Sequence, residues 1–328
     1  MTRYDESDAR IRPGRHKARP RTKDRPAHAS AIDGMVVAVD RGRFTVVVDE
    51  GLATERFVFA VKARELGRKG VLVGDRVGLV GDVSGAPDTL ARLVLLKERK
   101  SILRRTADDT DPTERAIVAN ADQVVIVQAL ADPPPRIRFI DRAMVAALYE
   151  GIEPILVLTK SDLADDAEIR ANYESLGVPI HTTSPDGDIA PLLQRLQGKV
   201  SVMIGHSGVG KSTLVNRLVP DAERLTGDVN DVTGRGRHTS TSAIALELPG
   251  GGWIVDTPGV RSFGLAHVDR SRLIDFFPEL VPGVESCPRS CSHNEEECGL
   301  DSWIEQEGIA ASRLDSLRRL LTSLEVGD

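Results

Sequence analysis

The sequence has no long hydrophobic run. None of its apolar stretches approaches the roughly 20 residues that cross a bilayer as a helix. Its first residues are polar and basic, without the apolar segment of a secretory signal. Hydrophobic residues make up 41% and charged residues 28%, which is ordinary for a soluble globular protein. We therefore expect a cytoplasmic protein with no membrane partner, and 328 residues leave room for two or three domains.

Cysteine is also scarce. The three cysteines, Cys287, Cys291 and Cys298, fall within twelve residues. An odd, clustered set in a cytosolic protein argues against a disulfide framework and for a metal or reactive site. With His293, the cluster offers three thiolates and one imidazole, enough to close a tetrahedral structural Zn²⁺ site. The alternative is three free thiols beside an exposed histidine, and the absence of cysteine elsewhere favours zinc.

Charge is distributed unevenly along the chain. Residues 1–28 contain nine Arg or Lys and four acidic residues, so this segment carries +5 and the remainder −11. A basic arm on an acidic body suggests a polyanionic partner such as a nucleic acid. The alternative is a solvated tail, because residues 1–30 are poor in apolar side chains and are expected to be disordered without a partner.

Residues 31–98 predict a small β-barrel. Five short apolar stretches separated by turn residues read as strands, and the OB-fold is the leading candidate: 35–39, 44–48, 56–61, 75–80 and 90–96. Such barrels often bind oligonucleotides. A basic rim for phosphate contacts is predicted at Lys62, Arg64, Arg68 and Lys69. Phe57 and Phe59 share one strand face and are interpreted as core residues rather than base-stacking platforms.

The period of the hydrophobic pattern changes after a predicted linker at residues 99–115. Apolar runs at 123–127, 155–158 and 178–181 read as buried strands, and helical spacing appears at 137–148, 166–176 and 189–196. This alternation predicts a doubly wound α/β domain over residues 116–268, with ligands at the carboxyl ends of its strands. An amphipathic helix is predicted at 309–324, within a C-terminal region at 269–328.

A phosphate-binding loop lies between a predicted strand at 200–204 and a predicted helix at 213–218. Its spacing is G-x-x-x-x-G-K-S, and the loop consists of Gly205, His206, Ser207, Gly208, Val209, Gly210, Lys211, Ser212 and Thr213. Glycines let the backbone N–H groups point at phosphate oxygens. Lys211 is expected to reach the β- and γ-phosphates, and the Ser212 hydroxyl to bind Mg²⁺. The alternative is a glycine-rich turn that happens to have this spacing.

A second loop indicates which base is bound. Thr159-Lys160-Ser161-Asp162 has the spacing of the guanine-reading N-K-x-D loop. The Asp162 carboxylate can accept hydrogen bonds from guanine N1–H and from the exocyclic amine, and adenine offers neither, which opposes an ATPase or kinase. The Lys160 stem can pack over the base, and Thr159 stands where Asn is usual. Thr183 and Ser184, one strand later, are predicted to supply backbone contacts to guanine O6.

A third loop has the D-x-x-G spacing, Asp256-Thr257-Pro258-Gly259. Asp256 is expected to hold Mg²⁺ through water, with the Gly259 N–H near the γ-phosphate. Thr239 and Thr241, in the polar loop upstream, are the candidates to complete the Mg²⁺ shell.

The sequence lacks the glutamine that orients the attacking water in many GTPases. Val260 follows the D-x-x-G loop where many GTPases place a water-orienting Gln, so slow intrinsic hydrolysis is expected. His238 is the local candidate to orient the water, and Arg235 or Arg237 is a candidate arginine finger. The alternative for all three is a solvated, flexible loop.

The order of the loops is unusual, because the guanine loop precedes the phosphate loop in a cyclic rotation of the ordinary GTPase order. With this order, the segments Gly205–Thr213, Gly234–Thr241 and Asp256–Arg261 make the chain resemble the ribosome small-subunit-dependent GTPase A family (RsgA, also called YjeQ). The resemblance implies an OB-fold, a permuted GTPase domain that binds GTP or GDP with Mg²⁺, and a C-terminal zinc-binding helical domain. It also points to His238.

The resemblance further implies a function in late maturation of the 30S ribosomal subunit, with GTP hydrolysis stimulated by that subunit. The expected partners are the 30S subunit and its 16S rRNA, and the chain is expected to be a monomer. The family spaces the first two cysteines, and the histidine and last cysteine, one residue wider than this chain does. The alternative is an RNA-binding assembly factor whose nucleotide is mainly structural.

Overall fold

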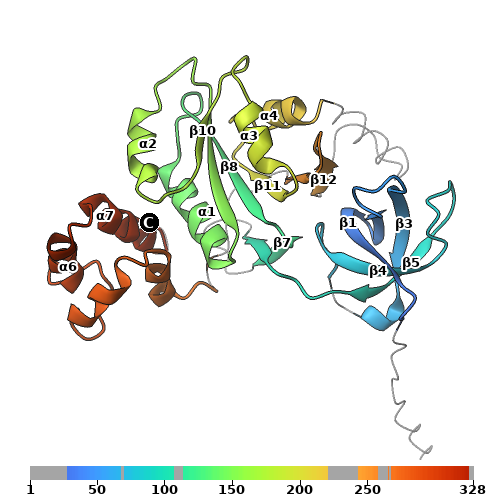
Figure 1. Ribbon diagram of the computed structural model, residues 1–328, viewed down its shortest axis with the longest axis horizontal. Coiled ribbons are helices and arrows are strands. Elements are labelled where there is room, and N and C mark those ends of the chain that lie inside the picture. Colours follow the sequence, from blue (N-terminus) through green and yellow to red (C-terminus); the bar gives the residue numbers. More distant parts are fainter. Residues whose placement is uncertain are drawn as a thin grey trace, which may run out of the picture.

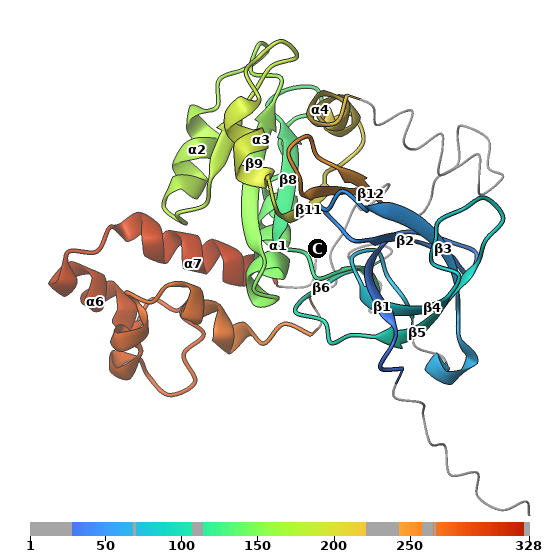
Figure 2. The same cartoon turned by 45° about the vertical axis from the view of Figure 1, so that its right-hand side comes forward.

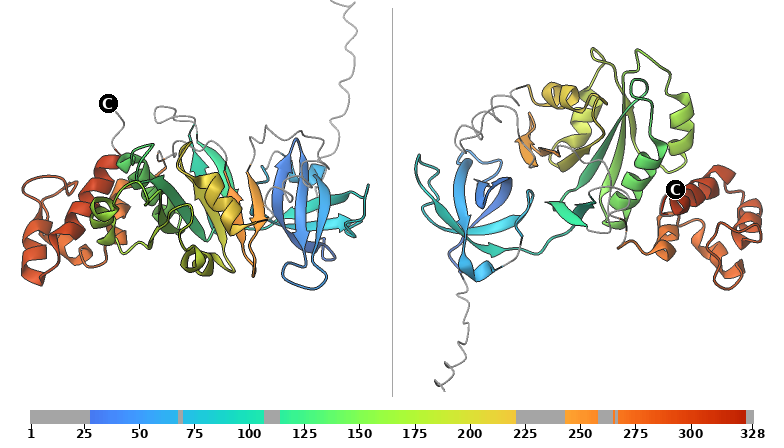
Figure 3. Two further views of the ribbon diagram at one scale, coloured as in Figure 1. Left: turned by 90° about the horizontal axis from the view of Figure 1, so that it is seen from above. Right: turned by 180° about the vertical axis from the view of Figure 1, so that it is seen from behind.

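The computed structural model describes residues 28–67, 70–106, 114–220, 243–257, 265 and 267–324. A β-barrel, a central α/β domain and a C-terminal helical region follow one another along the chain. The central domain lies between the other two (Figures 1 and 3). The predicted basic arm falls outside the described residues except for 28–30. None of the helices in the described ranges combines the length and apolar character needed to cross a membrane.

The N-terminal barrel closes through five strands, as the sequence predicts. The pairing runs β1-β2-β3-β5-β4 and returns to β1, with β3 and β5 parallel and the other pairs antiparallel. This is an OB-like closed barrel, and closure leaves no free strand edge within it. The strands are β1 Ile32–Asp40, β2 Arg43–Val48, β3 Arg56–Lys62, β4 Arg76–Gly81 and β5 Ala91–Leu96.

Strand β3 corrects one prediction about the barrel core. Val58 and Ala60 are fully buried, whereas Phe57 is 40% exposed and Phe59 is half-buried. Side chains alternate across a strand, so burying Val58 and Ala60 necessarily turns Phe57 and Phe59 outward. The interpretation of the two phenylalanines as core residues was wrong, because the register of β3 turns Val58 and Ala60 toward the barrel interior and not Phe57 and Phe59.

Part of the predicted linker is structured. Strands β6 Ile102–Arg105 and β7 Arg115–Ala119 pair antiparallel, and Leu103 of β6 and Val118 of β7 are buried. The predicted linker therefore contains strand β6 and the first residue of β7. The polar composition of 107–113 dominated the prediction, and those residues lie outside the described ranges.

The central sheet has the strand order β10-β9-β8-β11-β13-β12, and only β12 is antiparallel to its neighbour. The strand that leads into the phosphate loop, β11, therefore lies inside the sheet with parallel neighbours on both sides. The strands are β8 Gln123–Ala129, β9 Glu153–Thr159, β10 Ile180–Thr182, β11 Val200–Ile204, β12 Ile244–Glu247 and β13 Trp253–Asp256.

Helices cover both faces of this sheet, which confirms the doubly wound class. Val124 and Ile126 of β8 pack in one apolar cluster with helices α1 and α2, and Val125 and Val127 pack in the other with α3 and α4. This alternation explains why β8 is a continuous apolar run in the sequence. The helices are α1 Ile137–Tyr149, α2 Ala167–Glu174, α3 Ala190–Leu196 and α4 Lys211–Leu218.

The barrel is joined to the central sheet at its β12 edge. Strand β1 pairs antiparallel with β12 at Ala38 and Ile244, so one sheet runs from the central domain into the barrel. Next to this pairing, Trp253 Nε1 of β13 donates to Glu50 Oε1, which follows β2, over 2.6 Å. Both contacts attach the barrel to the strands that lead toward Asp256.

The C-terminal region packs on the central domain through helix α7. This region contains η3 Arg270–Phe276, η4 Val281–Ser286, α6 Gly299–Glu307 and α7 Ala311–Ser323. Leu314, Leu317, Leu320 and Leu321 are buried on one face of α7, which confirms the predicted amphipathic helix. Figure 2 shows α7 alongside α1, and α7 also contacts α2.

A buried polar cluster fastens α7 to the central domain. Asp141 of α1 is 2% exposed and accepts hydrogen bonds from Tyr173 Oη at 2.9 Å and from Arg319 Nε at 3.0 Å. The Arg319 guanidinium also lies over the Tyr173 ring, 4.6 Å from its centroid. Burial raises the pKa of Asp141, which the Arg319 charge opposes. Arg319 therefore supplies the positive charge that compensates the buried Asp141 carboxylate, and Tyr173 adds a neutral hydrogen bond.

Replacing Arg319 by Met should destabilise this junction. The substitution keeps the aliphatic stem but removes the charge beside Asp141, so the free energy of unfolding should fall by about 3–5 kcal/mol. Without the cation the folded-state pKa of Asp141 rises further. The folded state then binds a proton that the unfolded state releases, and stability falls as pH rises.

Urea unfolding of Arg319→Met at pH 5 and pH 8 measures both effects, and the loss should be larger at pH 8. Lys97→Met, which breaks an exposed pair with Asp33, is the control and should change stability by less than about 1 kcal/mol. An Arg319→Met protein as stable as this control at both pH values would contradict the prediction.

Candidate nucleotide site and metal-ligating cluster

The phosphate loop connects β11 to α4, as the sequence predicts. A Cβ atom at Gly205 would lie 2.6 Å from the Val127 carbonyl oxygen of β8, so only glycine fits there. Gly210 has φ of 86° at the start of α4, a left-handed conformation that favours glycine. These two positions let the loop turn tightly and direct backbone N–H groups at the helix start toward a bound anion.

The charged residues assigned to phosphate and magnesium lie together. Lys211 Nζ forms an ion pair with Asp256 Oδ1, because β11 and β13 are adjacent parallel strands. Thr257 Oγ1 donates to the Met203 carbonyl of β11 over 2.7 Å and fixes the start of the D-x-x-G segment. Ser212 follows Lys211 in the first turn of α4. A hydroxyl and a carboxylate oxygen are ligands that Mg²⁺ prefers, so the donor set fits that ion.

Thr159 joins the predicted guanine loop to the phosphate loop. Its side chain is buried at the end of β9, and Oγ1 donates to the Val209 carbonyl over 2.6 Å. The next residue, Lys160, donates from Nζ to the Asp132 carbonyl in the β8–α1 connection. Threonine in place of the usual asparagine therefore still spans the two loops with one hydrogen bond.

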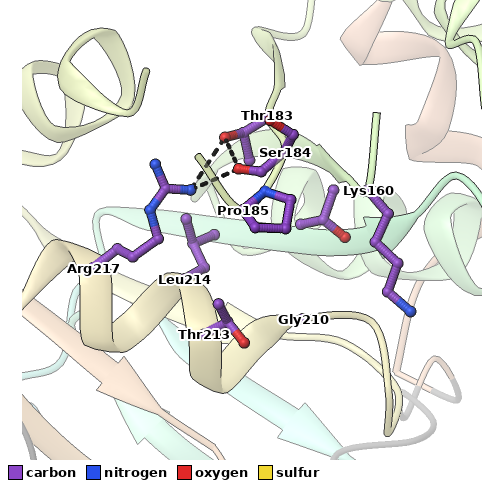
Figure 4. A pocket seen from close by; sticks show the side chains of 9 residues that line it. Lys160, Thr183, Ser184, Pro185, Gly210, Thr213, Leu214 and Arg217 are labelled. Atoms are coloured by element: carbon purple, nitrogen blue, oxygen red, sulfur yellow. Dashed lines mark hydrogen bonds between the residues drawn. The ribbon is translucent and has the colours of Figure 1, made fainter. Parts of the chain in front are cut away.

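A cavity of about 100 Å³ opens between these loops (Figure 4). Its lining includes Thr159, Lys160, Thr183 and Ser184, which the sequence assigns to guanine. The Thr183 N–H donates to Leu158 O at 2.8 Å, and the Ser161 N–H to Thr183 O at 3.3 Å, so the two segments predicted to bind guanine are joined by hydrogen bonds. Asp162 is exposed and lies outside this lining.

Arg217, Arg136 and Phe139 lie beside these loops but belong to none of the sequence motifs. Arg217 of α4 lines the cavity and reaches the Thr183–Ser184 segment. On the phosphate-loop side, the His206 ring packs 4.4 Å from the Phe139 ring centroid, and Arg136 Nη1 lies 3.5 Å from His206 Nδ1. Only the position of Arg217 on the helix after the phosphate loop points to it, since no motif includes that position.

Several predicted residues fall outside the described ranges. They are His238, Thr239, Thr241, Arg235, Arg237, Gly259 and Val260 around the hydrolytic step, and Arg68 and Lys69 on the predicted barrel rim.

The cysteine cluster is assembled as a metal-ligating group. One ligand atom from each of Cys287, Cys291, His293 and Cys298 lies within 4.8 Å of all the others. Cys287 Sγ is 3.7 Å from His293 Nδ1 and 3.9 Å from Cys298 Sγ, and Cys298 Sγ is 3.8 Å from His293 Nδ1. Tetrahedral Zn²⁺ with bonds of about 2.0–2.3 Å separates its ligand atoms by about 3.5–3.8 Å. The cluster therefore fits zinc despite its shorter spacing.

Neighbouring groups hold the ligands in place. The His293 N–H donates to Cys291 Sγ over 3.4 Å, and Arg318 Nε of α7 donates to the His293 carbonyl over 2.9 Å. Arg318 is itself held by both carboxylate oxygens of Asp301, at 2.9 and 2.7 Å. Burial lowers the pKa of His293, which favours the neutral ring that a metal binds.

Known proteins are similar to this chain in both sequence and fold. The RsgA GTPase family model matches residues 96–266. A protein of Chlorobaculum parvum named small ribosomal subunit biogenesis GTPase RsgA is 34% identical over 306 residues, covering 90% of this chain and 98% of that protein. A protein of Ectopseudomonas mendocina with the same name is 41% identical over 224 residues, covering 65% of each chain.

The chain belongs to the RsgA GTPase family. The crystal structure of YjeQ from Thermotoga maritima matches with a TM-score of 0.64 and 29% identity, over 90% of this chain and 99% of that one. The structure of YloQ, described as a circularly permuted GTPase, matches with a TM-score of 0.65 and 23% identity, over 92% and 97% of the two chains, and supports the fold. Family membership implies GTP or GDP and Mg²⁺ as ligands.

Replacing Thr159 by Val should loosen the contact between the two loops. Valine has the same shape but no hydroxyl, so the Val209 carbonyl loses its donor, and the free energy of unfolding should fall by about 1–3 kcal/mol. Affinity for GDP should fall as well, because the phosphate loop loses a support. Urea unfolding and equilibrium GDP binding measure the two effects.

Thr159→Ser, which keeps the hydroxyl, is the matched control and should bind GDP nearly as the unchanged protein does. Equal GDP affinity for the Val and Ser variants would show that the hydrogen bond does not support the site.

Proposed function

We propose that this chain is a GTP hydrolase that acts in late maturation of the small ribosomal subunit and is stimulated by that subunit. The observation that carries the proposal is the Thr159 hydrogen bond to Val209, which brings a guanine-type loop onto a phosphate loop in a chain of the RsgA GTPase family. The names of relatives that match most of this chain support the ribosomal function. A cytoplasmic location and a monomeric state complete the proposal.

Each part of the site has a defined chemical function in this proposal. Backbone N–H groups from Gly205 to Thr213 and the Lys211 ammonium hold the phosphates and neutralise charge that develops in the transition state. Ser212 and Asp256 would hold Mg²⁺, with Thr239 or Thr241 completing its shell, and the ion would supply charge neutralisation at the β- and γ-phosphates. The Gly259 N–H would contact the γ-phosphate. His238 orients the attacking water, since Val260 cannot accept or donate a hydrogen bond.

The barrel is the proposed contact to 16S rRNA. Phe57 presents an exposed aromatic surface on β3, and Lys62 and Arg64 follow at the end of that strand. Exposed aromatic rings stack on unpaired bases, and neighbouring basic residues contact phosphates. The basic arm at residues 1–28 adds a further electrostatic contribution.

One hydrolysis assay separates this function from its alternatives. GTP and ATP turnover are measured with and without purified 30S and 50S subunits. We expect slow turnover of GTP alone, strong stimulation by 30S and none by 50S, and no turnover of ATP. Turnover that stays absent with 30S subunits would favour an RNA-binding assembly factor whose nucleotide is mainly structural.

The same assay tests His238. The His238→Ala variant should bind GTP as the unchanged protein does and lose the stimulated hydrolysis. Equal stimulated rates for the variant and the unchanged protein would remove His238 from the mechanism.

We also propose that Cys287, Cys291, His293 and Cys298 bind one structural zinc ion. All four positions of a tetrahedral ion would be taken by protein ligands, which leaves none for a substrate. Between η4 and α6 the chain has little regular structure, and the ion would stabilise this segment in place of a hydrophobic core.

Removal of zinc should therefore unfold the C-terminal region. Metal analysis should find about one zinc per chain, and Cys298→Ser should lose it together with near-ultraviolet signals from Trp303, which packs beside Gly283 in this region. Ser290→Ala, a change in the same loop outside the ligand set, should keep the metal. A folded C-terminal region without metal would contradict the proposal.

A further inference from the structure

Arg217 contacts the segment that follows β10 from the opposite side of the nucleotide cavity. It lies on α4, the helix that begins at Lys211, and its guanidinium is half-buried. Nη1 donates to Ser184 O over 2.8 Å and approaches Thr183 Oγ1 at 3.4 Å, and Nη2 donates to Gly187 O. Figure 4 shows the side chain reaching from α4 to Thr183 and Ser184. One planar group thus holds three oxygen atoms of one turn.

The turn that Arg217 holds is tight. The Gly187 N–H donates back to Ser184 O over 3.1 Å, and a Cβ atom at Gly187 would lie 2.9 Å from Ser184 N. On its other side the turn is fastened to β9 and the guanine loop through Thr183. The segment is therefore clamped between the strand that precedes the guanine loop and the helix that follows the phosphate loop.

The orientation of the peptide groups decides what this segment can recognise. Arg217 donates hydrogen bonds to the carbonyl oxygens of Ser184 and Gly187. Within the described part of the chain, the Ser184 N–H donates no hydrogen bond. Ser184 lines the cavity, so a donor at this position suits an acceptor on a bound base. Guanine carries a carbonyl oxygen at C6 as such an acceptor, and adenine carries an amine donor there.

We propose that Arg217 is a positioning residue that sets recognition of the C6 oxygen of the purine. This proposal rests on the proposed GTPase function. By holding the carbonyl oxygens of the turn, Arg217 keeps the N–H group of Ser184 available to the base. Loss of the guanidinium frees the turn to rotate these peptides, and the selectivity for a C6 oxygen is lost while phosphate binding is retained.

Comparing the variants on two nucleotides isolates this effect. GDP has the C6 oxygen; 2-aminopurine riboside diphosphate keeps the N2 amine and both phosphates but lacks the C6 oxygen and also the N1–H that Asp162 is expected to bind. Asp162 is the same in every variant, so a change in the affinity ratio between variants reports the C6 contact. Equilibrium affinities for these two nucleotides, and for ADP, are measured on the unchanged protein, Arg217→Met, Arg217→Lys and the control Arg195→Met. Arg195 lies on α3, where it pairs with Glu153 at a partly exposed site.

We expect Arg217→Met to weaken GDP binding about tenfold, the effect of losing one buried hydrogen bond, and to change binding of the 2-aminopurine nucleotide less than about twofold. The ratio of GDP affinity to 2-aminopurine nucleotide affinity should therefore fall by about fivefold or more. Arg217→Lys keeps the charge without the planar fork and should give an intermediate ratio. Arg195→Met should keep the ratio of the unchanged protein.

Three results would overturn the proposal. If Arg217→Met lowers the affinity for both nucleotides by the same factor, Arg217 supports the fold and not the contact to the base. If Arg217→Met does not fold, an unchanged ratio in Arg217→Lys leads to the same conclusion. If the unchanged protein binds ADP as tightly as GDP, the proposed GTPase function itself fails, and the function of Arg217 fails with it.

Discussion

The two loops of the candidate nucleotide site are joined by the hydrogen bond from the Thr159 hydroxyl to the Val209 carbonyl, 2.6 Å long. Parallel strands end at the same edge of a sheet, so β9 and β11 bring their loops together there, but parallel packing alone does not fix the distance between the loops. Thr159 fixes it with one short side chain. Arg217 adds a second link between the same two halves of the site, from α4 to the turn after β10. The base end and the phosphate end of the cavity are thus held as one unit.

The two outer parts of the molecule are attached at different places around this unit. The barrel joins the sheet at β12, beside the strand that carries Asp256. The C-terminal region joins through α7 at α1 and α2, and α2 begins a few residues after the guanine loop. Arg318 links α7 to His293, so the helix that contacts the central domain also supports the metal-ligating cluster. The barrel and the C-terminal region therefore both contact the central domain at elements that lie near predicted nucleotide-binding residues in the sequence.

Local patterns predicted the parts of the structure that local chemistry determines. The spacing of residues in short motifs predicted the phosphate loop, the guanine-type loop and the cysteine cluster. The period of the hydrophobic pattern predicted the barrel and the doubly wound domain. Phe57 was misassigned because sequence alternation does not say which face of a strand is inside. Strand β6 was missed because its partner lies beyond a polar stretch. Arg217 was not predicted because its partners are 30 and more residues away in the chain. His238 stays a prediction.

Recognition of guanine by the loop at Thr159–Asp162 is best tested by exchanging Asp162 for Asn. An amide N–H donates where the carboxylate accepts, so the Asp162→Asn side chain would oppose the guanine N2 amine, which is also a donor, whereas it can donate to the C2 oxygen of xanthine. Equilibrium binding of GDP and xanthosine diphosphate to the unchanged protein and to Asp162→Asn is the measurement. We predict that the unchanged protein prefers GDP and that the variant prefers xanthosine diphosphate. A variant that keeps its preference for GDP would show that Asp162 does not read the base.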